Sequence, residues 1–458
     1  MKIRNIVLIL IIFNYAIHLK AYTEFPDSHW MMYKTPEEAG WSSAKLKEAK
    51  KVFNKMNASS VMVIYKGKVL IAWGDVNRRF LVHSIRKSFV SALYGIYVKE
   101  KKININETLE ELKINDKEQL TETEKQAKIS DLLKARSGIY IPAVCETPQM
   151  RDQRPKRGSH KPGEFWYYNN WDFNVLGAIL KEKTGKSVGE NVMQKIAQPI
   201  GFEDFRMIDC FYNYEKELTN FPAYLFKMSA RDLCRFGLLY LSKGRWKGEQ
   251  IIGEDWIKES LTEYTVFKNL KNFSGYGYLW WLSKPFSEYG AFSASGLGGE
   301  FLTVLPKLDL VYCQRANTYE NKFITDSNRI KLMRMIVNAK ISEPKQDPKL
   351  MPMIIQPKYF SKLQLPKNKI KKYLGEYFFK NDTGNFYFEI KEEDGKICIW
   401  NHIIGNVILL PQNEKNFIFE DVGWRLWIDF RKGNNPLAII TMSNGKKYKC
   451  YRLSTKAL

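Results

Sequence analysis

The sequence predicts an α+β protein: an antiparallel sheet with flanking helices and an inserted helical subdomain, followed by a small antiparallel β-barrel. Three observations predict this class. Apolar strand-like runs at 61–73 and 301–314 are separated by a long, mainly helical region, so the early and late strands would pair in one sheet. Prolines cluster between 344 and 366, as in a linker. Short alternating segments at even spacing follow them and are typical of a barrel.

The N-terminal end has the pattern of a secretory signal peptide. Lys2 and Arg4 precede a nearly unbroken aliphatic run over 6–13, which is too short for a good membrane span. We expect cleavage near Ala21 and therefore export to the periplasm or the extracellular space, with an uncleaved anchor as the alternative. The domains expected are a signal peptide over 1–21, a main domain over 22–343, a linker over 344–366 and a barrel over 367–458.

Helix and strand signals alternate along the main domain. Ser42 is a good N-cap for an amphipathic helix. The elements expected in chain order are a helix to about Lys55, strands at 61–65 and 69–73, a helix from Ser84, further helices at 129–135, 172–183 and 229–242 within a mostly helical region over 85–270, strands at 278–282, 301–305 and 310–314, and a helix at 323–340. Helices inserted between the strands leave a cleft against the sheet, where ligands tend to bind.

Seven alternating segments predict the strands of the barrel: 386–390, 397–400, 407–410, 417–419, 426–430, 438–441 and 448–453. The barrel contains no evident catalytic set. The whole chain has six cysteines and five histidines without a metal-ligand spacing, so we expect neither a metal nor another cofactor. Cys398 and Cys450 could form a disulfide in an oxidising compartment, and the sequence leaves this open.

Ser84 and Lys87 form the most informative motif of the main domain. Ser84 opens the buried helix, and Lys87 stands one turn further along on the same face, within reach of the hydroxyl. The helix N-terminus favours an ionised serine oxygen and a nearby oxyanion. Burial could lower the pKa of the lysine, ordinarily about 10.4, far enough to free a neutral amine as a base. The spacing therefore predicts a nucleophile with a built-in base.

Other serines match similar patterns in poorer contexts. Ser-x-x-Lys also begins at Ser42, Ser342 and Ser443, but none of these opens a long apolar helix. Ser187 satisfies Gly-x-Ser-x-Gly, yet it follows a helix, whereas a nucleophile elbow follows a strand. With so few histidines, a Ser-His-Asp hydrolase is hard to assemble here, and a lysine-assisted serine is not.

Two further stretches could complete such a site. Tyr168 and Asn170 lie two apart in a loop, so both can point to one side, the phenol as a proton relay and the amide as a hydrogen-bonding group for lysine or substrate. Packing is the alternative for these residues. Gly296, Leu297, Gly298, Gly299 and Glu300 precede a strand. Their glycines would let backbone approach an acyl group closely, although a plain β-turn has the same composition.

The chain is strongly basic, with a formal net charge of +23. The lysines are spread rather than clustered and no nucleic-acid motif is present, so we expect no nucleic-acid partner. A solvated lysine-rich surface explains most of this charge, and attraction to an anionic envelope polymer is the alternative. We expect a small-molecule ester, amide or peptide as the partner and no stable membrane span, and the sequence does not indicate an oligomeric state.

In the order Ser-x-x-Lys, Tyr-x-Asn, glycine-rich strand, the chain resembles the class C β-lactamase and penicillin-binding-protein-like serine hydrolases. Further landmarks of that resemblance lie at 130–138, 162–170, 229–237 and 275–281, so it covers roughly 40–340. It implies a β-lactamase/transpeptidase-like fold over the main domain, which would be a serine hydrolase domain. The segment after Pro366 resembles the lipocalin-like domain appended to some of these enzymes.

The resemblance implies a role for each motif residue. Ser84 would be the acylated nucleophile, Lys87 and Tyr168 would share proton transfer, and Asn170 would position the substrate. The backbone N–H groups of Ser84 and Glu300 would form the oxyanion hole. The third motif usually begins with lysine or histidine, where this chain has Leu297.

The missing cation favours ester or amide hydrolysis over β-lactamase or carboxypeptidase activity. The expected function is therefore an exported serine hydrolase of the esterase or amidase type that works through an acyl-enzyme on Ser84. The alternatives are a peptidase or amidase acting on D-amino-acid or wall-derived peptides, a sensor or binding protein that is acylated without turnover, and a degenerate scaffold.

Overall fold

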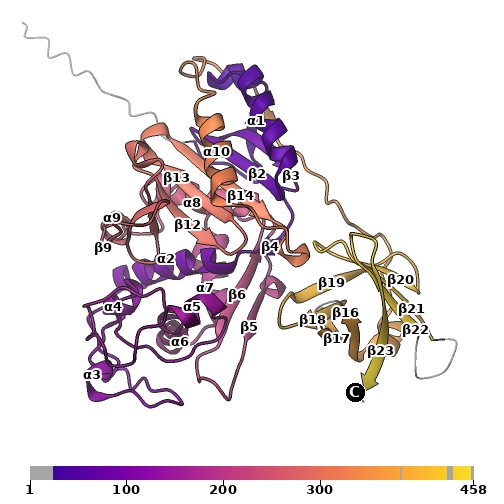
Figure 1. The fold of residues 1–458 in the computed structure, drawn as a ribbon. Coiled ribbons are helices and arrows are strands. Elements are labelled where there is room, and N and C mark those ends of the chain that lie inside the picture. Colours follow the sequence, from indigo (N-terminus) through magenta and orange to yellow (C-terminus); the bar gives the residue numbers. More distant parts are fainter. Residues whose placement is uncertain (1–23, 382–383, 431–436, 455–458) are drawn as a thin grey trace, which may run out of the picture.

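A large mixed sheet organises the main domain. The computed structural model describes residues 24–381, 384–430 and 437–454, and the predicted signal peptide lies outside them. The sheet has the strand order β15-β1-β3-β2-β14-β13-β12-β11-β10-β9 and is antiparallel except where β1 pairs with β3 (Figure 1). Its strands are β1 Met31–Tyr33, β2 Ala58–Tyr65, β3 Lys68–Gly74, β9 Thr265–Val266, β10 Phe273–Tyr276, β11 Trp281–Ser283, β12 Phe292–Gly296, β13 Glu300–Leu305, β14 Leu310–Ala316 and β15 Leu350–Pro352.

Helices cover both faces of this sheet because its central strands alternate between two apolar clusters. Val61, Val63 and Tyr65 of β2 pack under α1 (Ser43–Lys55) and α10 (Asp326–Val337). Met62 and Ile64 face the other way, towards α8 (Ala230–Leu241) and α2 (Arg86–Lys99). α1 and α10 lie side by side although they come from opposite ends of the domain (Figure 1). The predicted pairing of early and late strands is confirmed, since β2 pairs with β14.

The helical insertion lies between β3 and β9, and it is less purely helical than predicted. Its remaining helices are α3 Glu122–Lys125, α4 Ile129–Leu133, α5 Pro148–Asp152, α6 Asn170–Thr184, α7 Val188–Val192 and α9 Glu254–Ser260. It also holds a three-stranded sheet in the order β4-β6-β5 and a short hairpin. Their strands are β4 Phe80–Leu81, β5 Cys210–Asn213, β6 Ala223–Met228, β7 Arg245–Trp246 and β8 Glu249–Gln250.

One predicted strand, 278–282, is wrong over its first half. Gly277 donates its N–H to the Trp280 carbonyl at 2.9 Å and Leu279 has φ +61°, so the chain turns sharply before β11 begins at Trp281. Trp280 is fully buried. The run is apolar because it enters the core, and that composition does not separate a buried turn from a buried strand. The neighbouring strands β10 and β12 have polar or glycine positions and were not predicted.

The C-terminal part is a closed antiparallel barrel of eight strands, as the sequence predicts apart from the first strand. Pairing of β16 with β23 closes it around an apolar core. The strands are β16 Gly375–Asn381, β17 Gly384–Glu393, β18 Lys396–Asn401, β19 Gly405–Pro411, β20 Asn416–Phe419, β21 Arg425–Asp429, β22 Leu437–Thr441 and β23 Lys447–Ser454, preceded by α11 Lys367–Ile370. Cys398 and Cys450 lie on strands that are not neighbours, and all six cysteines are free.

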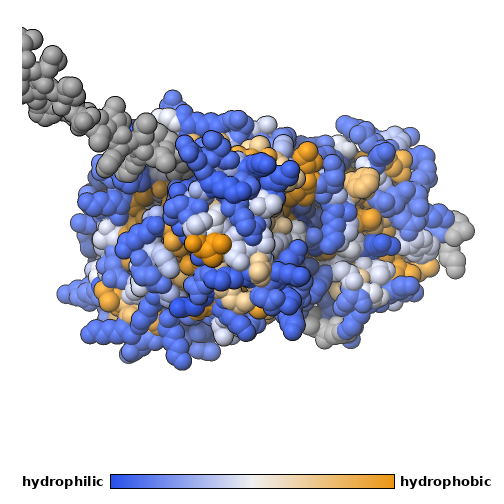
Figure 2. Space-filling view, turned by 90° about the horizontal axis from the view of Figure 1, so that it is seen from above, coloured by the Kyte–Doolittle hydropathy of each residue, from blue (hydrophilic) through white to orange (hydrophobic). Residues whose placement is uncertain are grey.

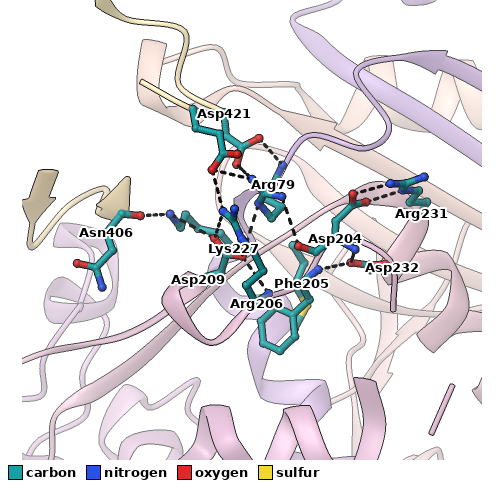
Figure 3. Close-up of polar contacts among 12 residues, drawn as sticks. Arg79, Asp204, Phe205, Arg206, Asp209, Lys227, Arg231, Asp232, Asn406 and Asp421 are labelled. Atoms are coloured by element: carbon teal, nitrogen blue, oxygen red, sulfur yellow. Dashed lines mark hydrogen bonds and ion pairs between the residues drawn. The ribbon is translucent and has the colours of Figure 1, made fainter. Parts of the chain in front are cut away.

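A network of buried charges docks the barrel against the main domain (Figure 3). Arg79 pairs with Asp421 at 2.7 Å and with Glu420 at 3.1 Å, both from the barrel, and its Nε lies 3.5 Å from Asp209 of the main domain. Arg206 reaches Glu420 at 2.9 Å. Burial raises the pKa of the Asp421 carboxyl and Arg79 opposes that rise. These charges are therefore stable only while both domains supply partners.

Backbone carbonyls of the barrel extend the same interface. Lys227 of β6 donates to the Asn406 carbonyl and lies 3.6 Å from Asp209. Arg78 donates to the carbonyls of Asp421 and Val422. The interface thus fixes the barrel to β6 and to the segment just before β4, which leads into the Ser84 turn.

One face of the protein is mainly polar. Figure 2 shows one face on which hydrophilic residues predominate and apolar residues occur in small, separate patches. No helix within the described ranges combines the length and apolar character needed to cross a bilayer.

We predict that Arg79→Met destabilises the protein by about 3 kcal/mol, because it leaves carboxylates of both domains buried without their partner. Thermal or urea unfolding measures the loss, and limited proteolysis should show faster cleavage between 344 and 366 as the barrel undocks. The matched control is Lys51→Met, which removes an exposed pair with Glu48 and should cost less than about 1 kcal/mol. Equal effects of the two substitutions would contradict a stabilising role for the interface.

Candidate active site

Ser84 lies in a single 3-10 turn, η2 (His83–Ile85), directly before α2. His83 has φ +47°, an unusual conformation for a residue with a side chain. Gly296 at the end of β12 presses against this turn: a Cβ there would lie 2.8 Å from the Val82 carbonyl oxygen. Ser84 therefore lies directly before α2, whereas the sequence predicted it within the first turn of that helix. β12 lies beside this turn.

Lys87 lies between the two hydroxyl groups that the sequence singled out. Its Nζ is 2.9 Å from Ser84 Oγ and 2.8 Å from the Tyr168 hydroxyl. The Lys87 side chain is 2% exposed, and its Nζ sits 4.4 Å from the centroid of the Tyr168 ring and 4.6 Å from that of Phe173. Within the described ranges no carboxylate forms an ion pair with it. The amine is surrounded by hydroxyls and aromatic rings instead.

This environment sets the protonation of the site. Burial, and next the neighbouring Arg86 charge, lower the pKa of Lys87 well below its ordinary value. Burial raises the pKa of Tyr168 to about 12. The lowered pKa favours the neutral amine, the form that can accept the Ser84 proton, while the phenol keeps its own proton at neutral pH and can donate it. One nucleophile, one base and one acid are in mutual contact.

Asn170 begins α6 and lies in the same cavity. Its Nδ2 donates to the Cys145 carbonyl at 2.7 Å, whereas its Oδ1 is buried without a partner. Asn169 caps the helix by accepting from the Trp171 N–H, and it donates to the buried Asp172 carboxyl at 2.9 Å. The cap holds Asn170 in place, and its free carbonyl oxygen can accept one hydrogen bond from a substrate N–H.

The cavity beside Ser84 has a volume of about 740 Å³. Three sides come from the main domain: the Ser84 turn, the loop before α6, and the end of the large sheet. Its lining residues include Ser84, Arg86, Cys145, Met150, Tyr168, Asn170, Leu225, Phe273, Trp281, Ser295, Gly296, Leu297, Gly298, Gly299, Phe301 and Ile324. Four of the five predicted glycine-rich residues, Gly296 to Gly299, therefore line it. The space suits an organic group considerably larger than acetate.

Glu300, the fifth residue of that segment, does not line the cavity. Its carboxyl group is fully buried and pairs with Arg315 at 3.1 Å. Arg315 also donates to the carbonyls of Met228 and Phe80 at 2.6 and 3.0 Å, so it ties β14 to β6 and β4 beneath the Ser84 turn. The role of Arg315 was missed, although a lone arginine ending an apolar strand pattern was a usable signal.

Two lining residues come from the barrel: His402 and Ile403. No local pattern in the sequence pointed to either. By contrast Ser187, the rejected Gly-x-Ser-x-Gly serine, caps α7 by accepting from the Glu190 N–H at 3.2 Å and lies outside the cavity. No group of three or more His, Cys, Asp or Glu side chains in the described ranges is arranged to hold a metal ion.

Comparison with known proteins identifies relatives of this arrangement. The family model described as Beta-lactamase matches residues 49–319, more than half of the chain. A teichoic acid D-alanine hydrolase from Staphylococcus aureus is 30% identical over 138 residues, 29% of this chain, and the match spans only about a third of that relative's length, 34%.

Solved structures show the same fold. A candidate beta-lactamase from Bacteroides dorei superposes with a TM-score of 0.51 at 14% identity, covering 65% of this chain and 99% of that one. A family VIII carboxylesterase gives 0.50 at 16% identity, with 68% and 99% covered. A candidate 6-aminohexanoate-dimer hydrolase from Bacillus anthracis gives 0.50 at 19%, with 70% and 91% covered. These likenesses confirm the predicted fold class of the main domain.

We predict that the stability difference between wild type and Lys87→Met depends on pH. Burial lowers the pKa of Lys87 in the folded protein only, so between that lowered pKa and about 10.4 the unfolded state binds more protons. Wild type should therefore gain stability relative to the variant as pH rises towards about 10.4, by up to about 1.4 kcal/mol per unit. Urea unfolding at each pH measures this difference. Lys51→Met, an exposed lysine, should show none, and a flat difference for Lys87→Met would mean that the buried amine stays charged.

Proposed function

Because this chain belongs to the beta-lactamase family, we propose that it is a serine hydrolase that cleaves an ester or amide through an acyl-enzyme on Ser84. The observation that carries the proposal is the position of a buried Lys87 amine within hydrogen-bond distance of both Ser84 and Tyr168. A serine hydroxyl is a weak nucleophile until a base removes its proton. Lys87 is suited to that task because its Nζ lies 2.9 Å from Ser84 Oγ and burial lowers its pKa.

The steps follow from the positions of the groups. Lys87 takes the Ser84 proton as Oγ attacks the substrate carbonyl carbon, and the oxyanion receives hydrogen bonds from backbone N–H groups at the head of α2. We assign the second donor to the backbone N–H of Glu300, which directly follows the Gly296–Gly299 segment of the cavity lining. The Tyr168 phenol donates its proton to the leaving group. Lys87 then passes the proton that it took from Ser84 to the Tyr168 oxygen. Water then hydrolyses the acyl-enzyme and regenerates Ser84.

Esters or amides without a carboxylate next to the scissile bond are the favoured substrates. Leu297 is apolar, 54% exposed and part of the cavity wall, so this position offers no cation to such a carboxylate. The free Asn170 carbonyl oxygen supports a substrate N–H or an α-ammonium group nearby. These features agree with a small acyl group that carries a hydrogen-bond donor.

D-Alanyl esters are a second, narrower candidate. The similarity to a teichoic acid D-alanine hydrolase favours them, and an α-ammonium group could donate to Asn170. Such substrates belong to the cell envelope, which agrees with the signal-peptide pattern over 1–21 and with the basic composition of the chain. We therefore place the enzyme outside the cytoplasm.

We predict that Ser84→Ala abolishes turnover of p-nitrophenyl acetate and labelling by a fluorophosphonate, because the acylated oxygen is gone. Rate assays and intact mass spectrometry measure the two effects. Ser187→Ala is the matched control, and it should keep both activities while losing about 1 kcal/mol of stability with its helix cap.

The same assay separates the alternatives. A wild-type adduct that forms and decays identifies a hydrolase, whereas a persistent adduct with p-nitrophenyl acetate identifies an acylated sensor. Labelling that survives in Ser84→Ala refutes Ser84 as the nucleophile. Matched D-alanyl and L-alanyl esters then test the narrower substrate, with faster hydrolysis of the D-ester expected.

A further inference from the structure

The barrel contributes a wall to the cavity that contains Ser84. The turn between β18 and β19 carries His402 and Ile403, and both line that cavity. Ile403 is 53% exposed, which is unusual for an isoleucine in a turn whose next residue, Ile404, is 2% exposed and part of the barrel core. An exposed aliphatic side chain beside a reactive serine can mark a surface that binds an apolar ligand.

The turn that displays Ile403 is held rigidly. Asn401, itself 2% exposed, accepts hydrogen bonds from the N–H groups of Ile403 and Ile404 at 2.7 and 3.4 Å and donates to the Tyr387 carbonyl. Gly405 follows with φ +66°, and a Cβ there would lie 2.3 Å from the Phe211 ring of β5. The turn therefore packs directly on the main domain, at a contact only glycine allows.

The charged interface fixes the same region at its other side. Lys227 binds the Asn406 carbonyl two residues beyond the turn, and Arg79 pairs with Asp421 (Figure 3). Arg79 also pairs with Glu420. Moving the turn away from Ser84 would break these buried pairs. The wall formed by Ile403 is thus a permanent part of the cavity.

The cavity that Ile403 completes has apolar side chains on several of its walls. Leu225 belongs to the small sheet, which the barrel contacts, and aromatic or aliphatic side chains line the end of the large sheet: Phe273, Trp281, Leu297 and Phe301. Polar side chains also line the cavity, among them Glu146, Asn213 and Asp326. A substrate that fills this space carries an apolar substituent beyond its reacting carbonyl.

We propose that the 402–403 turn of the barrel is a specificity element, and that Ile403 favours esters or amides with an apolar substituent over smaller ones. The inference rests on the proposed hydrolase function. It assigns to the barrel a direct contact with substrate in addition to its docking role. Without Ile403, the apolar substituent would face water instead of an aliphatic wall.

The test compares Ile403→Ser with Leu453→Ser in the full-length protein. Both residues are exposed aliphatic side chains of the barrel, 53% and 54% exposed, but Leu453 is not part of the cavity. The substrates are p-nitrophenyl acetate, butanoate and hexanoate, and a second series of acetates in which the alcohol is lengthened. Thermal unfolding verifies that each variant is folded.

In Ile403→Ser, the ratio of kcat/KM for the longest ester to that for the shortest should fall by about 5- to 50-fold in one of the series. The loss should appear mainly in KM, Ile403→Leu should restore the ratio, and Leu453→Ser should leave it as in wild type. Unchanged ratios in both series, with Ser84-dependent turnover intact, overturn the specificity role and leave the hydrolase function standing. A wild-type protein that neither hydrolyses the esters nor reacts with fluorophosphonate overturns both.

Discussion

The burial of one amine among aromatic rings and hydroxyls is the condition on which the whole site depends. Lys87 sits in a pocket of aromatic rings and hydroxyls, within hydrogen-bond distance of Ser84 and Tyr168. A carboxylate partner would have stabilised the ammonium form and removed its basicity. Burial acts on both neighbours in useful directions, because it lowers the pKa of the lysine and raises that of the phenol to about 12. One property of the environment thus prepares a base and an acid together.

The scaffold maintains this arrangement with contacts that are themselves costly. His83 holds a left-handed backbone conformation, and its ring Nε2 lies 2.9 Å from the Thr318 hydroxyl. Beneath the turn, burying the Arg315 and Glu300 charges costs desolvation energy. The hydrogen bonds that Arg315 also donates to backbone carbonyls help to offset that cost. Such a pair adds little net stability, but it fixes the strands from which the nucleophile turn and the cavity edge extend.

The barrel is joined to the site by two different kinds of interaction. Ion pairs around Arg79 hold the barrel against the main domain, while the turn with Ile403 lines the cavity itself. Tyr319, next to Thr318, also packs against the apolar core of the barrel. The segment that contacts His83 is therefore the segment that contacts the second domain. A change in barrel docking could therefore alter the position of the Ser84 turn through Tyr319, Thr318 and His83.

Much of this could be predicted from sequence because it is local. The spacing of Ser84 and Lys87 places both on one helical face whatever surrounds them, and alternating apolar segments define most strands of the sheet and barrel. The errors lie where local composition misleads. Leu279 turns within an apolar run, whereas β5, β10, β12 and β16 pair with the next strand along the chain but contain polar, charged or glycine residues that interrupt an apolar strand pattern.

The sequence by itself determined the class of fold, the two-domain order, and the nucleophile with the amine one turn away, since each depends on residues close together in the chain. Only the tertiary structure decided that Lys87 is enclosed by the loop of Tyr168, that Glu300 supports the sheet beneath the cavity, and that Ile403 joins its wall. These contacts join segments separated by tens to hundreds of residues. Their geometry depends on how the sheet, insertion and barrel pack, which no local pattern records.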